Sequence, residues 1–529
     1  QQRQAEMKEK TTFPTISQVG GCSCCSSKCS IAGSLDRRSF ITGLGTAAAG
    51  AAYASAASPR EKWTAPERFN AAGKALVVQP VLVYTRSERR EGTSWRPWGS
   101  IQTDQDAAGE VKRISAELGE LASKADFQVQ FKEIASVKDG EAEKIKRLTS
   151  GDYDVLLMFA AGGWVDTLES LVKPEKQTVV FLRHRSGPVY LWYEIISNRF
   201  LRKTVDEYGQ PGVNTKDVVV DDYGKVLLRL RALNGLKATF GKKILCIGGA
   251  AGWGEGGRKA PQMTRKHFGM ELVNITYDEL GIRLKQAYEN QLLVKWCREK
   301  ADHLLREPGV SLETEKDFVW KSFLLTEVFH QLLREHQTDT LTINLCMGTI
   351  MDVSGTTACL ALSFLNDAGY PAFCESDFVV IPSGILLHNI SGKPVFLNDP
   401  TWAHDGIVTL AHCTAPRRMN GEGLADARIM THFESDWGAA PKVEMKIGQE
   451  LTVIDPDFNF REWLGFTAEI EENPFLDICR SQIDIAFSCD TDELNYRTKG
   501  FHWMACYGDY SRELEYALDK TDLGWSKLG

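Results

Sequence analysis

Four residues in the last third of the chain have the types and the setting expected of a metal centre: Glu375, Asp399, His412 and His502. Each stands where an apolar, strand-like run meets a polar turn. Carboxylate oxygens and imidazole nitrogens together suit a divalent ion such as Mn2+. Any one of these side chains alone is equally an ordinary solvated residue at a strand end. The predicted metal site therefore depends on all of them together.

The spacing of the two acids favours the same site. Glu375 and Asp399 lie 24 positions apart, with a helix-like segment at 378–390 and a Gly- and Pro-containing turn between them. A strand, helix and strand unit of that length can return both carboxylates to one edge of a sheet. His412 follows a further short strand that we predict at 406–411.

The elements that must position these residues form a regular pattern upstream. From the apolar run at 75–84, short apolar segments alternate with amphipathic helical segments, which is typical of a parallel sheet flanked by helices. A long helical segment at 223–240 leads to a second unit of this kind, whose first strand is at 244–247. Beyond residue 442 the strands shorten and alternate. The predicted fold class is α/β, with two Rossmann-like parallel-sheet domains followed by a mixed, partly antiparallel α+β carboxy-terminal domain.

Composition and pattern together predict five segments. Hydrophobic residues make up 43% and charged residues 25% of the chain, as in ordinary globular proteins. The net charge of -8, without a basic stripe, argues against nucleic acid as a partner. The segments are a leader at 1–57, a linker at 58–74, a first α/β domain at 75–215, a second at 216–345 and a metal-bearing carboxy-terminal domain at 346–529.

The leader contains a twin-arginine pattern, Asp36-Arg37-Arg38-Ser39-Phe40-Ile41, followed by an Ala/Gly-rich run at 41–57. This arrangement is typical of a signal for the twin-arginine export machinery. The run is short and weakly apolar compared with the roughly 20 apolar residues of a membrane span. We therefore expect a periplasmic or otherwise extracytoplasmic protein, with a retained amino-terminal anchor as the alternative.

Cysteines fall into two groups. Cys22, Cys24, Cys25 and Cys29 cluster ahead of the twin arginines, and their spacing lacks the pairs of a zinc ribbon or a ferredoxin. A soft-metal site there is the alternative, and the fate of this cluster during processing is open. The other cysteines mostly lie within apolar runs, so we expect buried thiols and no disulfide framework.

Several stretches of the carboxy-terminal third resemble the L-fucose and L-arabinose isomerase superfamily. They are ACLALSFLNDAGYPAFCESD, LLHNISGKPVFLNDP and AHCTAPRRM between Ala358 and Met419, and the later GFHWMACYGDY. The similarity extends from about Ile343 to Tyr510. It implies Mn2+ or another divalent cation as cofactor, a small-molecule sugar as substrate and a homo-oligomer. It also implies that the ligands are Glu375, Asp399, His412 and His502.

The activity implied by this resemblance is the interconversion of an aldose and a ketose by proton transfer between C1 and C2. That reaction needs a base within hydrogen-bond reach of the carbon and a Lewis acid beside the developing oxyanion. Glu375 is the predicted base, with Asp399 as its catalytic partner. Spacing alone leaves open which of His412 and His502 is a primary ligand. The alternatives are a metal-assisted sugar epimerase or lyase, and an exported sugar-binding protein of the same fold without turnover.

Nearby residues suggest further contacts. Trp402 and Trp503 each lie within three residues of a predicted ligand, and an aromatic face suits the C–H side of a sugar; core packing is the alternative. Arg417 and Arg418 suit an anionic substrate group, with an ordinary salt bridge as the alternative. The glycine-rich loop at 248–257 lacks the G-x-G-x-x-G spacing of dinucleotide sites. It is either a loop that faces the sugar pocket or a structural turn.

Overall fold

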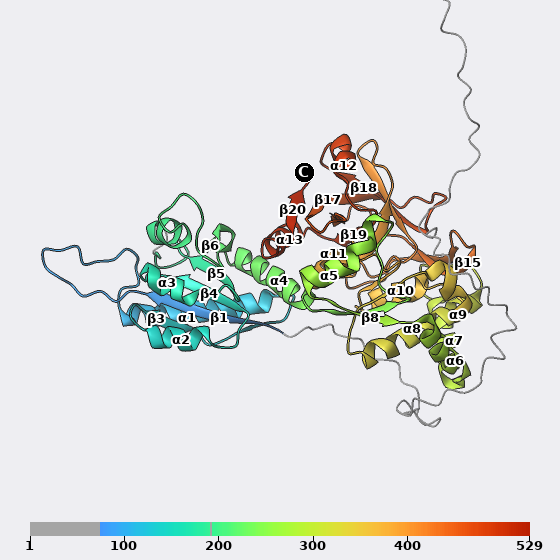
Figure 1. The fold of residues 1–529 in the computed structure, drawn as a ribbon, viewed down its shortest axis with the longest axis horizontal. Helices are drawn as coiled ribbons and strands as arrows, with labels where there is room; N and C mark the ends of the chain where they lie inside the picture. Colours follow the sequence, from blue (N-terminus) through green and yellow to red (C-terminus); the bar gives the residue numbers. More distant parts are fainter. Residues whose placement is uncertain (1–74, 191–192) are drawn as a thin grey trace, which may run out of the picture. The chain divides into compact units, whose positions relative to one another are not determined.

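Four β-sheets organise the part of the chain that the structure, a computed structural model, describes: residues 75–190 and 193–529 (Figure 1). These residues all belong to one compact unit. The predicted leader, with its twin arginines and Cys22, Cys24, Cys25 and Cys29, lies outside the described residues, as does the predicted linker at 58–74.

The first sheet is entirely parallel. Its strands are β1 (Leu76–Tyr84), β2 (Val129–Phe131), β3 (Ala135–Lys138), β4 (Val155–Ala160), β5 (Gln177–Leu182) and β6 (Val218–Val220). Their order is β2-β1-β4-β5-β6, and β3 pairs with the second half of β1. The accompanying helices are α1 (Asp104–Lys124), α2 (Ala142–Thr149), α3 (Val165–Leu171), the π-helix η2 (Tyr193–Leu201), η3 (Thr215–Asp217) and α4 (Tyr223–Thr239).

Helices cover both faces of this sheet, because successive strand residues point in opposite directions. Val83 of β1 packs in the same core as Leu168 of α3. Its neighbour Leu82 belongs to the other core, with Ile114 of α1 and Leu230 of α4. The predicted helix-flanked parallel sheet is confirmed.

A second parallel sheet has the order β11-β10-β7-β8. Its strands are β7 (Lys243–Ile247), β8 (Glu271–Ile275), β10 (Leu341–Ile343) and β11 (Ala372–Phe373). The helices of this region are η4 (Gly256–Lys259), α5 (Ala260–Phe268), α6 (Tyr277–Glu289), α7 (Gln291–Leu304), α8 (Lys316–Glu335), η5 (Cys346–Ile350), α9 (Met351–Ser354) and α10 (Cys359–Asp367). The second predicted parallel sheet is therefore also present.

The carboxy-terminal region contains a mainly antiparallel sheet that closes on itself. Its strands are β12 (Phe396–Pro400), β13 (Ile407–His412), β16 (Glu450–Pro456), β17 (Glu462–Glu472), β18 (Ser481–Phe487), β19 (Trp503–Tyr507) and β20 (Gly524–Lys527). The order is β16-β19-β12-β13-β18-β17-β20, and β16 also pairs with β17, which closes the ring. Only β20 joins in parallel, alongside β17.

A small sheet and three helices complete the region. The sheet contains β9 (Val310–Glu313), β14 (Ala427–His432) and β15 (Trp437–Val443). The helices are α11 (Ile381–Ser391), α12 (Thr491–Arg497) and α13 (Ser511–Leu518). This mixture of helices with antiparallel strands confirms the mixed, partly antiparallel class predicted for the end of the chain.

The sheets combine segments from both sides of the predicted domain boundaries. β6 extends the first sheet to Val220, beyond the predicted limit at 215, and β11 brings residues 372–373 into the second sheet. The division into domains itself stays a prediction.

Among the described residues, no single helix has both the length and the apolar character needed to cross a membrane. One pair of helices bent by 88°, Cys346–Ser354 and Cys359–Asp367, meets that requirement jointly, by length and composition alone.

Candidate metal centre

The predicted ligands converge where the second parallel sheet meets the closed antiparallel sheet. Glu375 follows β11, Asp399 lies on β12, His412 ends β13 and His502 directly precedes β19. The prediction that one sheet edge carries both acids was wrong, because β11 and β12 belong to different sheets. The helix between them, α11, is buried along nearly its whole length and packs against α4. It connects β11 of the parallel sheet to β12 of the closed sheet.

Strand register places Asp399 beside His502. β12 lies between β13 and β19 in the closed sheet. Asp399 pairs with Ala411, the neighbour of His412, while Asn398 pairs with Trp503, the neighbour of His502. Because side chains alternate along a strand, this register puts Asp399 and His502 on the same face, with Oδ1 of Asp399 3.2 Å from Nε2 of His502, whereas His412 reaches the cluster from the end of β13.

Glu375 reaches the same point through an unusual backbone. Its φ is 65° and that of Ser376 is 48°, both in the left-handed region that non-glycine residues rarely adopt. The loop is held on its far side, where the Phe378 N–H donates to the carbonyl of Ala251 at 3.2 Å. Strained residues of this kind persist only where the surrounding structure fixes them, and they cluster at functional sites.

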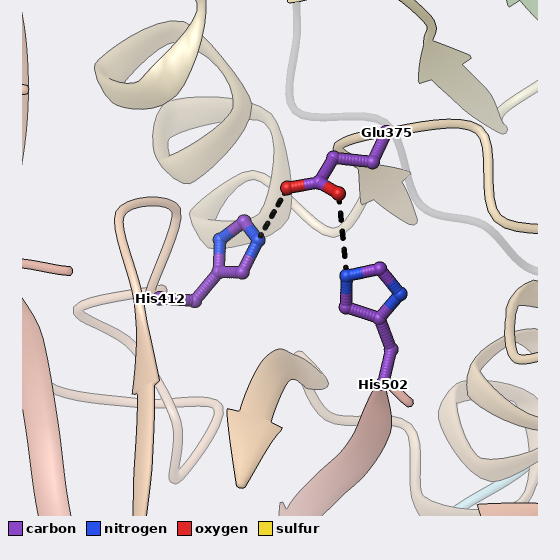
Figure 2. Close-up of side chains that lie close together, drawn as sticks. All are labelled: Glu375, His412 and His502. Carbon is purple, nitrogen blue, oxygen red and sulfur yellow. Dashed lines mark ion pairs between the residues drawn. The ribbon is translucent and has the colours of Figure 1, made fainter. Parts of the chain in front are cut away.

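The Glu375 carboxylate points between two imidazoles, one to each oxygen (Figure 2). Its Oε1 lies 3.6 Å from Nε2 of His412, and its Oε2 lies 3.3 Å from Nε2 of His502. One ligand atom from each of these three residues lies within 4.8 Å of the others. Ligands of an ion bound at about 2.1 Å stand roughly 3 to 4 Å apart, so one divalent ion fits between these atoms.

Two buried polar atoms at this point lack hydrogen bonds. In the described part of the chain, neither Asp399 Oδ1 nor His502 Nε2 has a hydrogen-bond partner, although the two atoms are only 3.2 Å apart. An unsatisfied buried polar atom costs about 1–3 kcal/mol. A cation between the two atoms would satisfy both, so the donor set fits a bound metal.

The electrostatics of the centre favour positive charge. Burial disfavours the charged form of Glu375, but His502 and His412 outweigh burial and lower the pKa of this carboxyl. Burial opposes charge on His412 as well, yet Glu375 and Asp399 raise its pKa, and the same carboxylates with Asp377 raise the pKa of His502 well above its usual value. A divalent cation can replace these protons as the partner of the carboxylates.

Asp377 contacts the candidate centre and had not been singled out from the sequence. Its Oδ2 accepts a hydrogen bond from Nδ1 of His502 at 2.7 Å, and its Oδ1 accepts from the backbone N–H groups of Trp253 at 3.0 Å and Val379 at 3.1 Å. Metal-ligating histidines commonly donate their second nitrogen to a carboxylate, which fixes the tautomer. The available signal was a second acid two positions after Glu375.

His412 has a comparable partner on its far nitrogen. Oγ1 of Thr414 lies 2.9 Å from Nδ1 of His412, in hydrogen-bonding contact. Both histidines are thus held on the Nδ1 side, and both present Nε2 to the Glu375 carboxylate.

The glycine-rich loop at 248–257 borders the centre. The Trp253 ring stacks on Phe501, with centroids 3.9 Å apart and planes at 9°, and Phe501 contacts the edge of His502. A Cβ at Gly252 would lie 2.1 Å from the carbonyl oxygen of Gly257, so the fold of the loop requires glycine there.

Two further titratable residues lie within electrostatic range. Burial lowers the pKa of His432 to about 4, helped by the charges of His412 and Arg480. Burial also raises the pKa of Glu434, helped by nearby carboxylates at the centre. His432 ends strand β14, and its place near His412 had no signal in the sequence.

The structure does not bring the two predicted substrate-binding tryptophans into the ligand cluster. Trp402 is 74% exposed, three residues beyond Asp399. Trp503 is buried and packs against Phe466, with ring centroids 5.7 Å apart. Substrate binding by either residue stays a prediction.

The two arginines have structural partners. Arg417 is buried and pairs with Glu307 at 3.1 Å, and Arg418 donates to the carbonyl of Glu422 at 2.6 Å. Arg417 thus forms a salt bridge, although a buried one, whereas the cited contact of Arg418 is with a backbone carbonyl.

No protein-family model matches the chain, and no curated protein matches it. The functional argument therefore depends on the geometry of the residues themselves, together with the resemblance noted in the carboxy-terminal third.

Proposed function

We propose that the protein is a metal-dependent isomerase that interconverts an aldose and a ketose by moving a proton between C1 and C2 of a monosaccharide or a derivative. The observation that carries the proposal is the pair of buried atoms without hydrogen-bond partners in the described residues, Asp399 Oδ1 and His502 Nε2, beside the Glu375 carboxylate. The resemblance to the L-fucose and L-arabinose isomerase superfamily supplies the substrate class. We also propose that the two parallel-sheet regions are Rossmann-like domains.

Four side chains would hold the ion. Mn2+ or another divalent cation, when bound, would polarise neighbouring sugar oxygens as a Lewis acid. The histidines contribute orientation, because Asp377 and Thr414 hold their Nδ1 atoms. The side chains of His412 and His502 are 4% and 0% exposed, which favours both as ligands over a role in binding the substrate directly.

The two carboxylates have the access that proton transfer requires. The side chains of Glu375 and Asp399 are 21% and 20% exposed, so they form the more open side of the cluster, where a sugar would approach. In its ionised form Glu375 would accept the proton from carbon. Asp399 would serve as its partner at the sugar oxygens.

We also propose where the protein is located and that it forms a homo-oligomer, each from a different observation. Export by the twin-arginine machinery to the periplasm or another extracytoplasmic compartment rests on the motif at 36–41. A homo-oligomer rests on the resemblance alone.

The test measures metal and proton transfer in the same preparation. The purified full chain is analysed for bound metal, and exchange of the C2 proton into deuterated water is followed by NMR across a panel of aldoses. We expect one Mn2+ per chain and exchange with formation of a ketose. Metal and sugar binding without exchange would favour the binding protein, and exchange with another product would favour the epimerase or lyase.

Variants at two carboxyls make this test specific. Glu375→Gln should abolish exchange while the protein stays folded, because the amide cannot accept the proton. Glu434→Gln is the matched change at a neighbouring carboxyl and should retain exchange. Full activity of Glu375→Gln would remove Glu375 from the mechanism.

A further inference from the structure

Two pairs of thiols flank the candidate metal centre, and each pair includes the neighbour of a predicted ligand. Cys374 precedes Glu375, and its Sγ lies 3.4 Å from the Sγ of Cys346. Cys413 follows His412, and Cys479 packs against the small buried cluster that contains Cys413. All these cysteines are free thiols.

The topology of the second sheet explains the first contact. β10 and β11 are adjacent parallel strands, with Leu341 paired to Ala372 and Thr342 to Phe373. Cys374 directly follows β11, and Cys346 begins η5, three residues after β10 ends. The carboxyl ends of the two paired strands thus bring the sulfurs together. An S–S bond of about 2.05 Å requires them to approach by roughly 1.4 Å more.

Exposure gives the two thiols different roles in an exchange reaction. Cys346 is partly exposed, while Cys374 is buried, so a soluble reagent reaches Cys346 first. Both thiols adjoin non-glycine residues in left-handed conformation, since φ is 54° at Leu345 and 65° at Glu375. Such backbone conformations persist only where neighbouring contacts hold them. A new bond between the two segments would alter the contacts that hold the backbone of Glu375.

We propose that Cys346 and Cys374 form a reversible disulfide, and that its closure displaces the Glu375 carboxylate from His412 and His502. The oxidant is a low-molecular-weight disulfide. The Cys346 thiolate attacks one sulfur of the oxidant and releases its first thiolate; Cys374, losing its proton, then attacks Cys346 and releases the second. Two cysteine thiols and one disulfide thus become one protein disulfide and two small thiols. The effect on metal affinity rests on the proposed function, whereas the disulfide rests on the thiol contact alone.

The experiment equilibrates the full chain in glutathione buffers of graded redox poise, traps free thiols by alkylation and maps disulfides by peptide mass spectrometry. Mn2+ affinity is measured on the reduced and oxidised samples. We expect a bridge between Cys346 and Cys374 that dithiothreitol reverses, with Mn2+ binding weakened at least about tenfold in the oxidised protein, the range seen when the support of a metal ligand is lost.

Two matched variants identify the pair. Cys346→Ser should abolish both the bridge and the oxidative loss of affinity. Cys479→Ser, which removes the partly exposed thiol of the other pair, should change neither. Thermal unfolding of both variants checks that they are folded.

Different results separate the two proposals. Alkylation of both Cys346 and Cys374 under all buffers, a bridge between Cys413 and Cys479 in their place, or a correct bridge with unchanged Mn2+ affinity would each overturn the inference. If the reduced protein binds no Mn2+, the proposed function fails, and the peptide map still decides whether the disulfide forms.

Discussion

Replacing Asp377 by asparagine tests the support of His502. The Asp377 Oδ1 accepts two backbone N–H groups, from Trp253 and Val379, so an asparagine must place its carbonyl oxygen there. Its amide NH2 then faces Nδ1 of His502, which in the native protein donates to Asp377 Oδ2 at 2.7 Å. Two donors cannot share one bond, so the imidazole proton moves to Nε2, the atom that faces Glu375.

The expected cost follows from the loss of the Nε2 lone pair as a ligand. Removing the second partner of a metal-ligating histidine typically weakens metal affinity about 10- to 100-fold, or roughly 1.4–2.7 kcal/mol. We expect the upper part of that range, because the bond is charge-assisted and both side chains are buried.

Calorimetric titration of Mn2+ into the metal-free full chain at neutral pH measures this effect. Asp217→Asn is the matched control, because Asp217 is also a fully buried carboxylate and accepts from Tyr516 at 2.6 Å, outside the metal centre. The control should bind within about twofold of the native protein, as expected for independent sites. Native-like affinity of a folded Asp377→Asn, or equal weakening of the control, would refute the argument.

Two further predictions concern stability. Gly252→Ala should lower the unfolding temperature, because the new Cβ would lie 2.1 Å from the carbonyl of Gly257, whereas Gly119→Ala, with open space at its Cβ, should not; calorimetry that shows equal values would contradict this. Burial raises the pKa of Asp455 to about 7, although the N–H of Gly500 donates to it. Since the folded state holds this proton more tightly than the unfolded state, stability should fall as pH rises from about 4 to about 7, by up to about 1.4 kcal/mol per unit. Asp455→Asn should flatten that slope in urea unfolding of the metal-free protein, and an unchanged slope would show that Asp455 is not its source.

Local pattern and the family resemblance together named four candidate ligands. Three of them, Glu375, His412 and His502, lie close together in the structure, with Asp399 beside His502. Pattern could not assign strands to sheets. The strands β11 and β12 are both short and begin with apolar residues, yet one pairs in parallel with β10 and the other joins the closed antiparallel sheet. That choice depends on pairing partners far along the chain.

The residues that hold the candidate ligands in place could not be predicted, because their contacts also come from segments far apart in the chain. Asp377 is one of many acids in the sequence, and its role depends on His502 and on Trp253, which is 124 positions away. The glycine-rich loop was noticed for its composition, but its contact with Phe501 follows from tertiary packing, which residue spacing does not encode.

If a cation binds at the proposed centre, the division of the candidate ligands between two sheets would couple its binding to the assembly of the chain. Glu375 follows β11 of the parallel layer, whereas His412 ends β13 and His502 precedes β19 of the closed one, so neither layer alone holds all three residues of the cluster. Tight binding would then require both layers to be docked, and at a concentration 100 times the dissociation constant the cation would stabilise the folded chain by about 2.7 kcal/mol. Removing the metal with a chelator should therefore weaken the contact between the two layers before it destabilises the interior of either layer.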